Sequence, residues 1–157
     1  MSTPATDQGS ALSSVADIEA LADELSRSAD VIHKRVMAEI GKHRGGPVSE
    51  ADQTLARALL EDEVLLRQRA NALYADAATH VVKSLAASQA QVMQLTADAA
   101  EKIRKISRIA DVASLVGGLL TLAGAAATGQ AAPIIVAIER VSKQIKKIDA
   151  SAPNKAA

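Results

Sequence analysis

The sequence predicts an all-α protein: an elongated helical hairpin or bundle with long, coiled-coil-like helices and a small-residue-rich apolar hairpin near its C-terminal end. Two observations lead to this fold class. No Gly or Pro occurs from Val48 to Val116, and these two residues disfavour helix interiors most strongly. No charged residue occurs from Val112 to Ile138, the only stretch apolar enough to enter a bilayer.

The composition narrows the possible functions of this chain of 157 residues. Its 18 basic residues balance 18 acidic ones, which leaves no net charge to attract nucleic acid. Tyr74 is the only aromatic residue and Cys is absent, so base-stacking platforms, disulfides and thiolate metal sites are not expected. A core of Ala, Leu, Val and Ile buries little area per residue, which favours elongated pairing or self-association.

Residues 1–13 are expected to form a disordered tail, because Ser, Thr, Pro, Gly and Ala dominate them. They contain no basic region followed by an apolar one, as an export signal would. The expected location is therefore cytoplasmic, with membrane association or secretion by a route that needs no signal as the alternatives.

The first helix is predicted over residues 15–44. Ser14 and Asp17 form an S-x-x-D start signal, and Gly45 and Pro47 follow a basic last turn as stop signals. Apolar residues recur at steps of three and four along this helix, which predicts a heptad seam of Val15, Ile18, Ala22, Leu25, Ala29, Ile32, Val36 and Ile40.

A second helix is predicted over residues 50–110, so that residues 14–110 form one long helical hairpin. A helix of this length measures about 90 Å at 1.5 Å per residue, and the first helix covers only half of it. The apolar seam from Val81 to Ala110 then needs the C-terminal region, another protomer, or a break near His80 that folds the helix back. If the helix is unbroken, we expect an oligomer, or an elongated monomer whose C-terminal region docks on this seam.

Residues 111–149 are predicted to contain the uncharged segment and then a basic amphipathic helix that starts near Pro133. Residues 150–157 are expected to form a loose tail. The apolar stripe of the amphipathic helix consists of Ile134, Ile138, Val141, Ile145 and Ile148, and its basic face of Arg140, Lys143, Lys146 and Lys147.

The uncharged segment carries small residues at every fourth position, which predicts a ridge where another helix approaches closely. Such ridges join transmembrane helices, but the same ridge also suits packing inside a soluble bundle. Both interpretations stay open for the predicted helix-contact ridge of Ala113, Gly117, Thr121, Ala125 and Gly129.

A membrane-bound form of this segment would be conditional. Residues 112–129 reach about 27 Å as a helix, so a single span is just possible, and its glycines and hydroxyls make insertion marginal. A shallow hairpin that turns between Gly124 and Pro133 would place both basic flanks on one side, against anionic head groups. The predicted membrane-interface residues are Ile134, Ile138, Val141, Ile145, Ile148, Lys143, Lys146 and Lys147.

Neither a catalytic site, nor a metal site, nor a cofactor is predicted. The histidines His33, His43 and His80 are scattered and form no H-E-x-x-H motif. His43 is better explained as a cation near a helix C-terminus. The carboxylates of residues 61–63 point around a helix instead of converging. We therefore expect a non-enzymatic protein without a small-molecule substrate.

Two resemblances accompany these patterns. The sequence AASQAQVMQLTADAA (residues 86–100), with Leu73 and Tyr74 before it, is similar to the Ala/Gln-rich helices of the Reb proteins that form R-bodies, and to phasins. The arrangement over residues 100–149 resembles that of α-helical pore-forming toxins and type III translocators. These resemblances cover small parts of the chain and assign no functional residue.

The sequence thus leads to two functional hypotheses. The first is a self-associating helical protein with a conditional membrane-binding segment, either pore-forming-like or membrane-remodelling. The alternative is a soluble coiled-coil scaffold, chaperone or assembly subunit, Reb-like or phasin-like, whose apolar segment is bundle core. Expected partners are a second copy or another helical protein, and for the first hypothesis an anionic membrane surface. Nucleic acid is not an expected partner.

Overall fold

The computed structural model describes residues 10–42, 46 and 49–151. Over these residues the chain is helical and contains no strand, which confirms the all-α class. The elements in chain order are α1 (Val15–Lys42), α2 (Glu50–Ala75), the short 3-10 helix η2 (Ala77–His80), α3 (Gln89–Lys105), α4 (Ile109–Ala127) and α5 (Ala131–Ala150).

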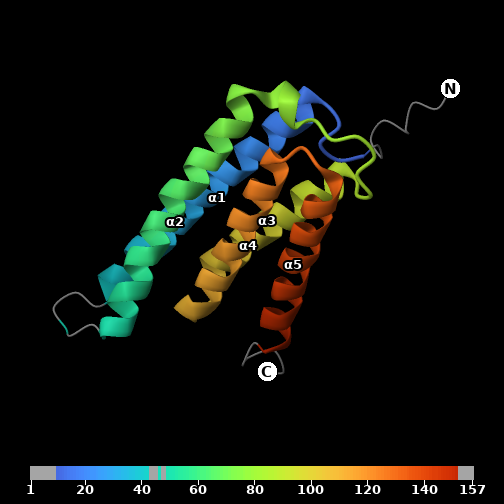
Figure 1. Ribbon diagram of the computed structural model, residues 1–157. Helices are drawn as coiled ribbons and strands as arrows, with labels where there is room; N and C mark the ends of the chain where they lie inside the picture. Colours follow the sequence, from blue (N-terminus) through green and yellow to red (C-terminus); the bar gives the residue numbers. More distant parts are fainter. Residues whose placement is uncertain (1–9, 43–45, 47–48, 152–157) are drawn as a thin grey trace.

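The helices pack as a bundle in which α4 is central (Figure 1). Helices α1 and α2 pack against each other as an antiparallel pair. In addition, α1 packs against α3, and α2 packs against α4. The last helix, α5, packs against α4 and α3. The most apolar helix is therefore surrounded by other helices, and its fully buried large side chains are Val112, Leu115, Val116, Leu119 and Leu122.

The first helix pair follows the sequence signals closely. The side chain of Ser14 accepts a hydrogen bond from the Asp17 amide, and Ser49 does the same for Asp52 at the start of α2. The seam residues of α1 from Ile18 to Val36 are buried in the core, but the two outermost residues of the predicted seam, Val15 and Ile40, are exposed. Stop signals predicted at Gly45 and Pro47 lie outside the described residues.

The predicted continuous helix over residues 50–110 is wrong, because the chain breaks twice. After α2 and η2, residues 81–88 form a loop, and a second break at residues 106–108 separates α3 from α4. The loop ends in a capping box in which Ser88 and Gln91 each accept a hydrogen bond from the other residue's amide. A break near His80 was one of the three predicted ways to cover the apolar seam from Val81 to Ala110. It folds α3 back onto α1.

The predicted disordered tail is too long, since residues 10–13 belong to the fold. Ala11 and Leu12 are fully buried. The Ala11 amide donates to the Ala87 carbonyl at 2.8 Å, and the Val82 amide donates to the Leu12 carbonyl at the same distance. This contact closes one end of the bundle. The remainder of the predicted tail, and most of the predicted C-terminal tail, lie outside the described residues.

Candidate interaction surfaces

The contact between α4 and α5 uses part of the predicted ridge. Thr121 accepts a hydrogen bond from Arg140 Nη1 at 3.1 Å, and Ser114 accepts one from Gln144 Nε2 at 3.2 Å. Gly117 lies under the same arginine, since a Cβ there would be 3.7 Å from Arg140 Nη2. Two of the predicted ridge residues, Gly117 and Thr121, therefore contact α5 of the same chain.

Gly118, which the ridge prediction missed, is the tightest point of this contact. A Cβ on Gly118 would overlap Gln144 Oε1 and lie 3.1 Å from Val141 Cγ2, so only glycine fits without a shift. The buried Gln144 Oε1 has no hydrogen-bond partner among the described residues. The adjacent glycines Gly117 and Gly118 could have indicated this contact from the sequence. The predicted ridge takes every fourth residue, so it included Gly117 and left out Gly118.

The other predicted ridge positions have separate roles. Ala125 is buried and Ala113 is half-buried on α4. Gly129 lies beyond the end of α4, so it is not part of a helical ridge. It turns the chain towards α5 with a φ of 66°, and a Cβ there would lie 3.2 Å from the Thr79 carbonyl oxygen. Its requirement for glycine comes from a turn.

The predicted membrane-interface helix divides into a packed stripe and an exposed basic face. Ile134 and Val141 are fully buried, and Ile138, Ile145 and Ile148 are half-buried and pack against the core. The three lysines of the prediction, Lys143, Lys146 and Lys147, are exposed. In this fold the bundle already occupies the apolar stripe, and only the lysines face outward.

Both basic flanks of the uncharged segment lie at one end of the bundle. α4 and α5 are antiparallel, so the start of α4 and the end of α5 are neighbours (Figure 1). An ion pair between Lys102 of α3 and Asp149 of α5 joins the two flanks. The exposed basic residues at this end are Arg104, Lys105, Arg108, Lys143, Lys146 and Lys147.

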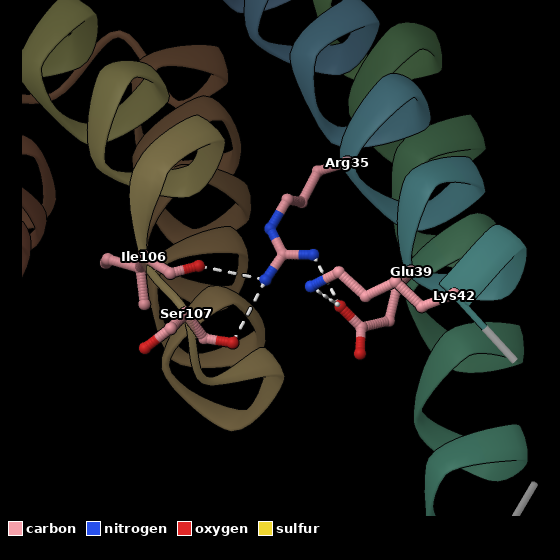
Figure 2. Close-up of polar contacts among 5 residues, drawn as sticks. All are labelled: Arg35, Glu39, Lys42, Ile106 and Ser107. Carbon is pink, nitrogen blue, oxygen red and sulfur yellow. Dashed lines mark hydrogen bonds and ion pairs between the residues drawn. The ribbon is translucent and has the colours of Figure 1, made fainter.

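Arg35 connects α1 to the corner between α3 and α4, as Figure 2 shows. Its Nη2 donates to the carbonyl oxygens of Ile106 at 2.9 Å and Ser107 at 3.3 Å, while its Nη1 donates to Glu39 Oε1 at 2.7 Å. The hydrogen bond from Arg35, followed by the charges of Lys42 and Arg35, lowers the pKa of Glu39 below its ordinary value. No motif in the sequence marks this buried arginine.

Beyond this corner, α1 and α2 continue with no buried residue among those that the structure describes there. Val36 is the last buried residue of α1 and Leu59 is the first of α2. We call residues 37–42 and 50–58 the distal arm. It extends about 10 Å past Arg35 on α1, at 1.5 Å per residue, and lies at the lower left of Figure 1.

A groove of about 340 Å³ runs between the two helices of the distal arm. Ile40, Ala56 and Leu60 provide its apolar lining, and Glu39, Asp52, Gln53 and Arg57 its polar lining. Ile40 is 46% exposed, and Met37, one turn earlier on α1, is 48% exposed. Large aliphatic side chains normally lose such exposure on folding, so this surface is a candidate for contact with another molecule.

The acidic cluster at residues 61–63 has a structural role. Glu63 is buried, and its carboxylate lies 2.8 Å from His33 Nδ1 and 2.8 Å from Arg67 Nε. Burial, with Glu61 beside it, raises the pKa of Asp62. His80 lies between two helix ends, with its ring nitrogens 3.0 Å and 3.3 Å from carbonyl oxygens of α4 and α2. Within the described part of the chain, no cluster of three or more His, Asp or Glu side chains has the arrangement of a metal site.

Comparisons with protein-family models, with curated proteins and with solved structures found no match for this chain. In the described ranges, α4 is the one helix long and apolar enough to cross a membrane, and half of that stretch is buried inside the bundle. The distal arm and the α4–α5 pair are therefore the two surfaces from which a function can be argued.

Proposed function

We propose that this chain is a non-enzymatic, self-associating helical-bundle protein that serves as a soluble scaffold or assembly subunit. The observation that carries this proposal is the position of α4. This helix, which carries no charge after Asp111, lies between α2 and α5, and the apolar stripe of α5 packs against the same core. The large apolar side chains of α4 that the bundle already buries have no need of lipid to cover them.

Support for self-association comes from the distal arm. Core burial stops at Val36 and Leu59, yet apolar residues continue on both helices beyond these points. A compact monomer would gain by placing polar residues at such exposed positions. Apolar side chains on two adjacent helices are instead typical of a surface that another helix covers.

Membrane attachment is the second candidate, and one observation favours it. The tip of the α4–α5 hairpin is uncharged, while its basic flanks lie together at the opposite end. If the hairpin left the bundle, its tip could enter a bilayer while the lysines and arginines met anionic head groups on one side. This requires α4 to release its contacts with α2 and α3.

Flotation with anionic and with neutral liposomes tests the choice, with and without mild acidification. For the scaffold we expect that the native protein stays with the soluble fraction at every salt concentration. Binding that needs α5 at the interface would behave differently. Replacing Lys143, Lys146 and Lys147 with Gln would weaken it mainly at low salt, and Ile138→Asp would weaken it at all salt concentrations. That pattern would favour the membrane candidate over the scaffold.

A further inference from the structure

The N-terminal segment, which we define as residues 10–12, lies on the loop between η2 and α3 (Figure 1). Ser10 and Ser88 form an isolated antiparallel β-bridge. The Ala11 amide and the Leu12 carbonyl continue this pairing with backbone hydrogen bonds to the loop, and both side chains are fully buried. The loop therefore carries a binding site for a short peptide segment, and the chain's own N-terminal segment occupies it.

This site needs an occupant of defined chemistry. The Val82 amide donates to the Leu12 carbonyl at 2.8 Å, and the Leu12 amide donates to Gln89 Oε1 at 2.9 Å. Val82 is buried, so loss of the segment would leave a buried amide without a partner, which is costly. An occupant has to supply a backbone carbonyl, a backbone amide and an apolar side chain in the position of Leu12. A second copy carries a segment that supplies all three.

The path by which the segment reaches its own loop is strained. Residues 11 and 12 form a turn, and Leu12 has a φ of 60°. This is the left-handed region, which leucine rarely adopts, and such strain persists only where surrounding contacts hold it. A segment that arrives from a second copy does not have to make this turn. Strain in a short connection favours exchange of the segment it carries.

The connection between the segment and α1 can lengthen at small cost. Residues 13–16 are all exposed, so straightening them gives up the Ser14 cap and the first turn of α1 but no buried side chain. Four extended residues span at most about 14 Å. Two copies that meet at this end of the bundle about a twofold axis can therefore each place a segment on the other's loop. The twofold axis makes both exchanges occur together.

We infer that two copies of this protein exchange their N-terminal segments, so that Ala11 and Leu12 of each copy are buried against the loop of the other. The inference rests on the proposed self-association and gives it a contact at the opposite end of α1 from the distal arm. The partner is a second copy because the site on the loop already binds this segment, and every copy carries one.

Disulfide trapping tests the exchange in the full chain, which contains no Cys. Ser10→Cys and Ser88→Cys place thiols at the two bridge positions, where the Cβ atoms of an antiparallel pair lie about 4.5 to 5.5 Å apart, close to disulfide geometry. The two single variants are mixed in reduced form and then oxidised. A disulfide between positions 10 and 88 then joins two different copies, and mass spectrometry of the linked peptides identifies it.

The matched control mixes Ser10→Cys with Ser107→Cys, which is exposed at the other end of α3. Thiols held in one site have effective concentrations of about millimolar, against micromolar for chance collisions, so the Ser10→Cys and Ser88→Cys mixture should give at least about tenfold more linked product than the control. Ser88→Cys also removes the cap of α3, so circular dichroism checks that each variant folds.

The double variant, with Ser10→Cys and Ser88→Cys in one chain, tests the same contact in the opposite direction. Oxidation of a dilute solution should form the disulfide within each copy, which keeps the segment on its own loop. Sedimentation equilibrium should then show weaker association than for the same protein after reduction, because the oxidised form cannot exchange its segment.

Each other outcome overturns a defined claim. If the double variant forms no internal disulfide, the segment does not bind the loop and the inference is wrong. An internal disulfide without linked product in the mixture would overturn the exchange, as would equal product in the control mixture or equal association of the oxidised and reduced double variant. In these cases a wild-type protein that still associates leaves the proposed self-association in place. A monomeric wild type without linked product would overturn both.

Discussion

The two antiparallel helix pairs of this bundle, α1–α2 and α4–α5, are held together by different means. In α1–α2, large aliphatic side chains form a buried seam, and ion pairs such as Asp30–Arg67 lie along its edge. In α4–α5, Gly118 leaves room for the side chains of Gln144 and Val141, and Thr121 and Ser114 accept hydrogen bonds from side chains of α5. Substitutions that make a buried side chain smaller should therefore destabilise α1–α2 most. Substitutions that make a side chain larger should destabilise α4–α5 most.

The largest expected effect comes from removing atoms from the α1–α2 seam. Leu25→Ala empties a fully buried position, so the free energy of unfolding should fall by about 2 to 5 kcal/mol. Urea unfolding followed by circular dichroism measures this change. The exposed Val64→Ala on α2 is the control, with an expected change within about 0.5 kcal/mol. Equal losses in the two variants would contradict a buried aliphatic seam.

Adding atoms to the α4–α5 contact should have the next largest effect. Gly118→Leu forces α5 away from α4, because a side chain there overlaps Gln144 and Val141, and we expect a loss of about 1 to 3 kcal/mol. Gly41→Leu on α1 is the control, since nothing lies within 4 Å of a Cβ at that position. It should be neutral or slightly stabilising because leucine favours helix. If Gly118→Leu leaves the free energy of unfolding unchanged, the tight contact at Gly118 does not hold α4 and α5 together.

The link between α1 and the α3–α4 corner should contribute less, and in a pH-dependent way. Arg35→Met removes hydrogen bonds to two carbonyls and to Glu39, with an expected loss of about 1 to 2 kcal/mol at pH 7. The pKa of Glu39 is lowered in the folded state, so its stabilising contribution is present above its ordinary pKa and disappears as the pH falls through the folded value.

Urea unfolding of both proteins at pH 7 and at pH 3 checks this linkage. The difference between wild type and Arg35→Met should shrink in acid, because protonated Glu39 no longer gains from the arginine. Lys34→Met, which removes an exposed charge from the preceding position, should show no such narrowing. If the stability difference between wild type and Arg35→Met is the same at both pH values, Glu39 is not responsible for the pH dependence.

The smallest effect is expected for the polar contacts of α4–α5. Thr121→Val keeps the shape of the side chain but removes the acceptor for Arg140, which is exposed and can bond to water instead. We expect a loss of about 0.5 kcal/mol. A loss above about 2 kcal/mol, measured by the same unfolding experiment, would mean that hydrogen bonds and not glycine contact dominate this pair.

The comparison also explains which parts of the fold could be predicted. The α1–α2 seam depends on a repeat of large apolar residues, which is visible in the sequence, so α1 and the start of α2 were predicted correctly. The breaks after Ala75 and at residues 106–108 contain no Gly or Pro. Tertiary contacts hold the first break, such as those of His80 with the ends of α2 and α4, and no local pattern reveals them. One local signal was missed, the S-x-x-Q capping box of Ser88 and Gln91 that starts α3.

The candidate surfaces were predicted less completely. The ridge was placed on the correct helix, yet its period selected Gly117 and missed Gly118, because the contact depends on the crossing of α5 and not on spacing alone. The distal-arm groove depends on where α3 and α4 stop covering α1 and α2. That position follows from the second break of the chain, so the exposure of Ile40 could not be deduced from its seam position.

The buried contact of Ala11 and Leu12 has a consequence for synthesis of the chain. The Leu12 amide donates to Gln89 Oε1, 77 residues later in the sequence. A chain that emerges from the ribosome N-terminus first can start to pair α1 with α2 before Gln89 has emerged. Contacts over such separations also form slowly, since a long loop must close first. The end of the bundle that holds Leu12 therefore closes late, and until then the nascent α1–α2 pair exposes the apolar face that α3 and α4 later cover.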